Sequence, residues 1–248
     1  MKADERERVN IFGILLDRVD YSKACQRVET FLKSYGNRII VTPNAEIIMA
    51  ARKAPELKAV LNEADICLPD GIGVVIASRI LGKPLTERTT GFDFMMKVLE
   101  MADKKELSLF LLGGKPGVAE KAGKKIKMMF PGINIAGFHH GYFKDEQEIV
   151  YQINDKKPDI IVVAMGCPKQ EMFMIRNKDK LKFRVAMGVG GSLDVISDTV
   201  RRAPVFMQKA GLEWLYRLLT QPSRFKRMSV LPLFLIEIIA YRLFPKKK

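Results

Sequence analysis

The sequence lacks any long apolar run. A membrane-spanning helix needs about 20 mostly apolar residues. Every stretch of this sequence that is free of Asp, Glu, Lys and Arg is shorter than that. The opening MKADERERVN is charged throughout, so we expect no secretory signal in it. Together these absences favour a protein that is neither secreted nor integral to a membrane.

Metal ligands and reactive thiols are also scarce. Cys25, Cys67 and Cys167 form no CxxC pair and no Cys/His ligand spacing, so we expect reduced thiols in a cytosolic protein. There is no Asp-x-Asp to hold a divalent metal beside a sugar nucleotide, and no HExxH. His139 and His140 are adjacent and need not face one ligand, so we expect them to be structural. The sequence therefore predicts no metal site and no cofactor.

Three widespread active-site motifs are missing as well. The chain has no GxSxG nucleophile elbow, no Walker loop, and no GxGxxG followed by an acidic residue. A serine hydrolase, a P-loop nucleotidase and a dehydrogenase are therefore disfavoured.

The charge that is present is concentrated at the C-terminus. The net charge over 248 residues is +14, and residues 201–248 carry +9 of it. Such a segment favours an anionic partner, which is nucleic acid, a phosphorylated ligand or an acidic membrane surface.

Short apolar runs alternate with helical patterns over the first 200 residues. The expected strands are 11–16, 38–42, 64–68, 107–112, 133–136, 159–165 and 184–187, and the expected helices lie near 21–35, 45–63, 72–82, 92–104, 117–129, 145–156 and 170–182. Apolar strands without alternation are typical of buried parallel strands. We therefore expect an α/β, Rossmann-like core with a mostly parallel sheet over residues 1–200, and ligands at the carboxyl ends of its strands.

The pattern changes near residue 200. Helical pieces interrupted by Pro204 and Pro222 mix basic and aromatic residues, and the mostly apolar residues 230–244 are interrupted by Pro232, Glu237 and Arg242. We expect residues 201–248 to form a basic, helical, amphipathic appendage that associates with membranes.

Two expected strand ends carry polar side chains. Thr42, Pro43 and Asn44 follow one strand, where Pro43 and Asn44 suit a turn and a helix cap, or Thr42 and Asn44 bind a polar ligand. Asp70 follows another strand, either as a helix cap or as a general base. Burial would raise the pKa of Asp70 toward the range that a base needs, and a helix N-terminus would oppose that rise.

Glycine-rich loops follow three further strands. They are Gly113-Gly114-Lys115, Gly166-Cys167-Pro168-Lys169-Gln170-Glu171 and Gly188-Val189-Gly190-Gly191-Ser192-Leu193-Asp194. Glycines let a backbone approach a phosphate, although close packing of helix on strand explains any one such loop. Because these loops and the two polar ones gather at one sheet edge, they favour a nucleotide or nucleotide-sugar site.

Five segments together resemble the WecG/TagA/CpsF glycosyltransferases, glycosyltransferase family 26, and a sixth resembles that family's tail. The segments are TPNAEI (42–47), LPDGIGV (68–74), GGKPGVAEKA (113–122), GCPKQE (166–171) and GVGGSLDVISDTVRRAP (188–204), with the tail GLEWLYRLLTQPSRFKR (211–227). They occur in the family's order and span nearly the whole chain.

The resemblance implies an inverting, metal-independent transfer from a UDP-sugar to a polyprenyl-diphosphate-linked sugar. In the most similar branch, N-acetylmannosamine (ManNAc) passes to undecaprenyl-diphosphate-GlcNAc for the wall teichoic acid linkage unit. The resemblance assigns Asp70 as base with Thr42 and Asn44 beside it. Candidate substrate-binding residues are Arg88, Gly113, Gly114, Gln170, Glu171, Gly190, Gly191 and Asp194.

The basic tail gains a role from this resemblance. Arg217, Arg224 and Arg227 have the spacing of one helical face if Pro222 permits continuity, and they either grip the diphosphates of the substrates or form a solvated face. Residues 230–244 with Lys246–Lys248 would lie in the headgroup region at the cytoplasmic side of the plasma membrane. An uncovered apolar tail would also promote a homo-oligomer.

Alternatives remain open at this level. The donor sugar is ManNAc, its uronic acid or glucose. A non-catalytic nucleotide-binding or nucleic-acid-binding module is a different class of function. Nucleic acid is disfavoured, because the tail mixes its charge with large aliphatic side chains that suit a lipid interface better.

Overall fold

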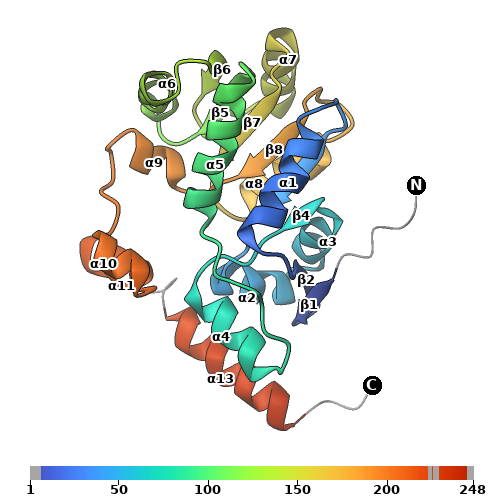
Figure 1. The fold of residues 1–248 in the computed structure, drawn as a ribbon, viewed down its shortest axis with the longest axis vertical. Coiled ribbons are helices and arrows are strands. Elements are labelled where there is room, and N and C mark those ends of the chain that lie inside the picture. Colours follow the sequence, from blue (N-terminus) through green and yellow to red (C-terminus); the bar gives the residue numbers. More distant parts are fainter. Residues whose placement is uncertain (1–6, 223–224, 226–228, 245–248) are drawn as a thin grey trace.

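A parallel sheet forms the centre of the structure, a computed structural model that describes residues 7–222, 225 and 229–244. The sheet strands are β3 (Arg38–Val41), β4 (Ile66–Cys67), β5 (Ser108–Gly113), β6 (Asn134–His139), β7 (Ile160–Ala164) and β8 (Val185–Gly188). They lie in the order β4-β3-β8-β7-β5-β6 and all pairs are parallel (Figure 1). The predicted α/β fold with a parallel, Rossmann-like sheet is confirmed.

Helices cover both faces of this sheet. One core includes residues of α2 (Ala45–Lys53), α3 (Pro55–Glu63), α4 (Ile72–Ile80), α7 (Glu146–Lys156), α8 (Lys169–Arg176) and α13 (Val230–Leu243). The other includes residues of α1 (Tyr21–Phe31), α5 (Gly91–Lys104), α6 (Val118–Met129) and α9 (Ser192–Ile196). Along β7, Ile161 and Val163 face the first core, and Ile160 and Val162 face the second. Burial on both faces explains why this strand is continuously apolar.

The single strand expected at 11–16 is wrong. The chain forms an antiparallel hairpin there, with β1 (Arg8–Ile11) paired to β2 (Ile14–Asp17). Phe12 and Gly13 make the turn with φ of 53° and 86°, the left-handed conformation that a two-residue hairpin turn requires. The glycine was the signal for this turn, and the apolar residues around it obscured it.

The single helix expected at 45–63 is two helices. Ala54 separates α2 from α3 and is extended, with φ of −128° and ψ of 92°. Pro55 begins α3, and a residue before proline is disfavoured in the helical conformation. The proline therefore ends one helix and starts the next.

The C-terminal helices pack on the core. α10 (Val205–Lys209) and α11 (Glu213–Thr220) precede α13, which lies along α4 and α2 (Figure 1). Phe234 and Ile238, one helical turn apart on α13, are fully buried, and Glu237 pairs with Arg52 of α2. Among the described residues no helix is both long and apolar enough to cross a membrane.

We expect Phe234→Ala to destabilise the protein much more than Phe244→Ala. Phe234 is fully buried and lies edge-on to Phe12, whereas Phe244 at the end of the same helix is 77% exposed. Emptying a buried phenylalanine site costs about 3–5 kcal/mol, and an exposed substitution stays within about 0.5 kcal/mol. Urea unfolding of the two variants measures the difference. Equal losses would contradict the packing of α13 on the core.

Candidate active site

A cavity of about 800 Å³ opens at the carboxyl ends of the sheet strands. Loops that follow β3, β4, β5, β7 and β8 line it, and α11 closes one side. The predicted site residues that line it are Thr42, Asn44, Asp70, Arg88, Gly114, Gln170, Gly190, Gly191, Asp194 and Arg217. The topology therefore brings together segments that are up to 175 residues apart in the chain, from Thr42 to Arg217.

Asp70 lies at the cavity between two backbone anchors. Its N–H donates to the Pro43 carbonyl at 3.1 Å, and its backbone forms a parallel bridge with Thr89. Gly71, and not Asp70, is the N-cap residue of α4, and its φ of 84° is left-handed. The interpretation of Asp70 as a helix cap is therefore wrong, and its carboxylate is left for the cavity.

Burial raises the pKa of Asp70 from 3.8 to about 6. Arg217, a backbone hydrogen bond from Gly91 and the Arg88 charge each lower this pKa, and Glu213 raises it. The rise in pKa caused by desolvation is larger than the fall caused by the cationic neighbours. The result is a carboxylate that is ionised at neutral pH and is still basic enough to accept a proton.

Thr42 approaches the same point as Asp70. A Cβ added at Gly91 would lie 2.7 Å from Thr42 Oγ1 and 3.7 Å from Asp70 Oδ2, so the start of α5 has no room for a side chain there. Asn44 caps α2 through its Oδ1, which accepts from the Ile47 N–H at 3.0 Å. Asn44 can therefore cap α2 and also line the cavity, because the cap uses only its side-chain oxygen.

Gln170 links two of the glycine loops. Its Oε1 accepts from the N–H groups of Gly166 at 3.2 Å and Gly190 at 2.9 Å, and its Nε2 donates to Glu171 Oε1 at 2.8 Å. Glu171 is 1% exposed and lies outside the cavity lining, and burial raises the pKa of its carboxyl. Gln170 therefore holds the loops after β7 and β8 in place, with Glu171 behind it.

Gly113 is also outside the lining. A Cβ there would lie 2.3 Å from the Ala164 carbonyl oxygen, and its φ is 141°. This glycine is required because β5 and β7 approach closely at their ends. Its neighbour Gly114 is the one that reaches the cavity.

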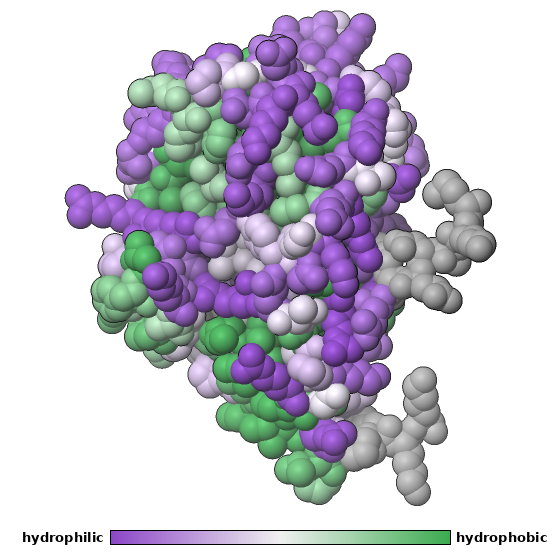
Figure 2. Space-filling model, viewed as in Figure 1, coloured by the Kyte–Doolittle hydropathy of each residue, from purple (hydrophilic) through white to green (hydrophobic). Residues whose placement is uncertain are grey.

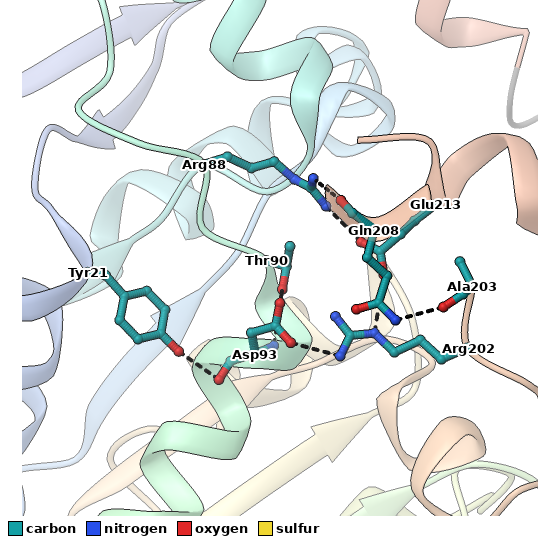
Figure 3. Close-up of polar contacts among 8 residues, drawn as sticks. All are labelled: Tyr21, Arg88, Thr90, Asp93, Arg202, Ala203, Gln208 and Glu213. Carbon is teal, nitrogen blue, oxygen red and sulfur yellow. Dashed lines mark hydrogen bonds and ion pairs between the residues drawn. The ribbon is translucent and has the colours of Figure 1, made fainter. Parts of the chain in front are cut away.

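Arg88 belongs to a network that joins the core to the C-terminal helices (Figure 3). Its Nη1 donates to the Gln208 carbonyl at 2.6 Å, and its Nη2 pairs with Glu213 Oε2 at 2.8 Å. Arg202 donates through Nε to Glu213 Oε1 at 3.2 Å and pairs through Nη1 with Asp93 at 2.8 Å. The sequence reasoning did not identify Arg202, Glu213 or Asp93 as site residues. The only available signal was that Glu213 is one of two acids in a basic tail.

Two aromatic residues of the cavity were also missed. The single tryptophan of the chain, Trp214, lines it from α11, and Tyr142 lines it from the loop after β6. Tyr142 is 66% exposed, so its ring is open to a ligand. A lone tryptophan in a basic segment was the available signal for Trp214.

The three tail arginines are not on one described helix. α11 carries Arg217 and ends at Thr220, before Pro222, so the continuity that a common helical face required is absent. Arg224 and Arg227 lie outside the described residues. Arg217 does line the cavity and lies close enough to Asp70 to lower its pKa.

The family model for the glycosyl transferase WecG/TagA/CpsF family matches residues 9–248. The chain belongs to this family. It is 42% identical over 212 residues to an N-acetylglucosaminyldiphosphoundecaprenol N-acetyl-beta-D-mannosaminyltransferase of Bacillus spizizenii, covering 86% of this chain and 82% of the relative. A protein of the same name from Staphylococcus aureus is 36% identical over 244 residues, which is 96% of each chain.

The protein is therefore a glycosyltransferase, as the sequence motifs predicted. A Bacillus subtilis relative of the same name is 39% identical over 201 residues, 81% of this chain and 78% of its own. The cavity at the sheet edge is the candidate active site of this glycosyltransferase, because it brings together a carboxylate, guanidinium groups and glycine loops.

Asp70→Asn is expected to stabilise the fold above pH 6. The folded-state pKa of about 6 lies above the ordinary 3.8, so stability falls as the pH rises from about 4 to about 6, and the full penalty is present above that window. A neutral Asn removes this penalty, which is of the order of 1–3 kcal/mol.

Urea unfolding at about pH 8 and about pH 4 measures this change. Asp179→Asn is the control, since Asp179 is exposed and its neutralisation should change little. Equal stability of wild type and Asp70→Asn at the higher pH would contradict a buried charge at Asp70.

Proposed function

We propose that this chain transfers N-acetylmannosamine from UDP-ManNAc to undecaprenyl-diphosphate-GlcNAc, in the synthesis of the wall teichoic acid linkage unit. The alignments cover 78–96% of the relatives' lengths, and the names of these relatives support the proposed acceptor and the proposed sugar. The observation that carries the chemistry is Asp70, a half-buried carboxylate at the cavity whose pKa desolvation raises to about 6.

The proposed reaction is one displacement with inversion. A hydroxyl oxygen of the acceptor sugar attacks the anomeric carbon, the bond from that carbon to the UDP oxygen breaks, and Asp70 takes the hydroxyl proton. UDP leaves with the electron pair of the broken bond. A positioned base contributes roughly 10²–10⁴-fold to such a step.

Cationic side chains would stabilise the departing diphosphate. Arg88, Lys115 and Lys169 line the cavity, and Gly114, Gly190 and Gly191 leave room for the diphosphate to approach the backbone. Donors aimed at developing charge are typically worth about 10²–10³-fold each. This arrangement supplies positive charge from the protein itself, and Thr42 and Asn44 hold sugar hydroxyls or orient Asp70.

The two substrates would enter from different sides. The glycine loops, Tyr142 and Asp194 form the side that suits the nucleotide, since an aromatic face binds a base and glycines leave room for a phosphate. Trp214, Arg217 and Leu231 form the side that the C-terminal helices contribute. That side suits the lipid-linked acceptor, because it pairs a cation with apolar surface.

The C-terminal helices also suit contact with an anionic membrane at the cytoplasmic face. Figure 2 shows hydrophobic surface over the region where α13 lies. The exposed large apolar side chains of α10, α11, α13 and the positions beside them are Val205, Phe206, Leu219, Phe225, Leu233, Ile236, Ile239, Tyr241, Leu243 and Phe244. Residues 201–248 carry a net charge of +9. Apolar burial and attraction to acidic lipids together determine the strength of such interfacial binding.

A donor panel tests the proposed reaction. UDP-ManNAc, its uronic acid, UDP-GlcNAc and UDP-glucose are each incubated with the full chain and a short polyprenyl-diphosphate-GlcNAc, and UDP release is measured. We expect turnover with UDP-ManNAc, and a loss of roughly 10²–10⁴-fold in Asp70→Asn with UDP binding retained.

Two outcomes would contradict this proposal. Turnover with another donor and none with UDP-ManNAc would exclude the sugar assignment. Near-normal turnover by Asp70→Asn would exclude Asp70 as the base.

Vesicle flotation tests the membrane contact. A variant with Leu233→Ser, Ile236→Ser and Ile239→Ser removes three side chains of α13 that are 48%, 62% and 45% exposed. We expect the wild type to float with phosphatidylglycerol vesicles and this variant to float much less, with both weakened by salt. Met128→Ser with Met129→Ser, on the exposed face of α6, is the control. Equal flotation of the α13 variant and the wild type would contradict the assignment, even if the variant changed self-association.

A further inference from the structure

Glu213 stands between two arginines where the C-terminal helices meet the core. Figure 3 shows its carboxylate pointing toward Arg88 on one side and Arg202 on the other, and the distances are 2.8 Å and 3.2 Å. Glu213 and Arg88 are 19% and 20% exposed at their side chains. A charge-assisted pair that is largely removed from water is stronger and more directional than a surface pair.

Arg202 has supports that do not involve Glu213. Its Nη1 pairs with Asp93 at 2.8 Å, and its guanidinium lies over the Phe92 ring at 4.3 Å. Burial raises the pKa of Asp93, but hydrogen bonds from Arg202 and Thr90 outweigh burial and hold that pKa below its ordinary value. The Asp93 carboxylate is therefore charged, and it would hold Arg202 if Glu213 were lost.

Arg88 has fewer supports. Apart from Glu213, the described residues give its guanidinium one hydrogen-bond partner, the Gln208 carbonyl, which receives Nη1 at 2.6 Å. Without Glu213, this one hydrogen bond would be left to orient the guanidinium. The orientation of Arg88 at the cavity thus depends on Glu213.

The same helix brings a second charge to the base. Glu213 begins α11, and Arg217 lies one turn further on. The charged groups that act on Asp70 are Glu213 and Arg217 from α11 and Arg88 from the segment before α5, with the Gly91 N–H. The helix therefore supplies one negative and one positive charge beside Asp70.

We propose that Glu213 is a positioning residue of the transfer reaction, which fixes the Arg88 guanidinium at the cavity and balances Arg217 beside Asp70. This inference rests on the proposed function, in which Asp70 is the base and Arg88 stabilises the leaving diphosphate. Through Glu213, a helix of the C-terminal segment completes the site that the sheet loops begin.

Glu213→Gln tests the proposal through the pH dependence of kcat/KM. Loss of the negative charge lowers the pKa of Asp70, which burial has raised to about 6, so the acidic limb of the profile moves to lower pH. Because Arg88 also loses its second anchor, we expect kcat to fall about 10-fold or more with a smaller change in UDP affinity. Glu213→Asp keeps the charge and shortens the reach, so it should lower kcat and leave the acidic limb in place.

Glu237→Gln is the matched control. Glu237 also pairs a C-terminal helix with a core arginine, Arg52, but neither residue lies at the cavity. We expect no movement of its acidic limb. A limb that stays in place in Glu213→Gln, or that moves equally in Glu237→Gln, would overturn the proposal. If Glu213→Gln does not fold, Glu213→Asp decides, and an unchanged kcat in that variant would overturn the proposal.

Failure of the proposed function is distinguishable from failure of this inference. If the wild type releases no UDP with any donor, the proposed function is wrong. The Asp70 carboxyl is then titrated directly by carbon-13 NMR in the wild type, Glu213→Gln and Glu237→Gln. The Asp70→Asn variant assigns the signal. A lower Asp70 pKa in Glu213→Gln alone supports the charge balance, and an unchanged pKa overturns it.

Discussion

The structure depends on a half-buried carboxylate whose pKa desolvation raises while cationic neighbours lower it. Asp70 is buried enough for its pKa to rise to about 6, and Arg217, Arg88 and the Gly91 N–H keep it from rising further. Arg217 comes from α11, Arg88 and Gly91 lie together at the start of α5, and the Asp70 backbone is itself held by Pro43 and Thr89. The pKa of Asp70 therefore depends on the ends of β3 and β4, the start of α5 and helix α11 together.

The same requirement explains the arrangement of the C-terminal helices. Ion pairs of Glu213 with Arg88 and Arg202 hold α11 at the cavity, and α13 packs on the core through Phe234 and Ile238, which are fully buried. Leu231 packs so closely that a Cβ at Gly73 would lie 2.4 Å from its Cδ1. A helix that carries exposed apolar side chains on one face thus has a second face committed to packing against α2 and α4.

Much of this could be predicted from the sequence. Continuous apolar runs marked the buried strands, and because parallel strands end at one edge, Thr42, Asp70 and the glycine loops were expected together. The hairpin at 8–17 was missed because one glycine in an apolar run is a weak signal. The Arg88–Glu213 pair could not be found, because it joins residues 125 apart and depends on how α11 packs. For α13, the same apolar pattern predicted a membrane face, and no spacing rule distinguished Phe234 and Ile238, which face the core, from Ile236 and Ile239, which are exposed.

The cavity has two sides, one formed by the sheet loops and the other by the C-terminal helices. In the proposed function the sheet loops bind the nucleotide sugar, because their polar groups line the cavity at the carboxyl edge of the sheet. The C-terminal helices contribute Arg217, Trp214 and Leu231 on the side where apolar surface is exposed, which is the side that an acceptor embedded in a membrane would approach. Asp70 lies where the two sides meet, and its charge balance includes α11. The two α11 charges oppose one another at this carboxylate, because Arg217 lowers the Asp70 pKa and Glu213 raises it. In the proposed reaction, the strength of Asp70 as a base therefore depends on the same helix that lines the acceptor side of the cavity.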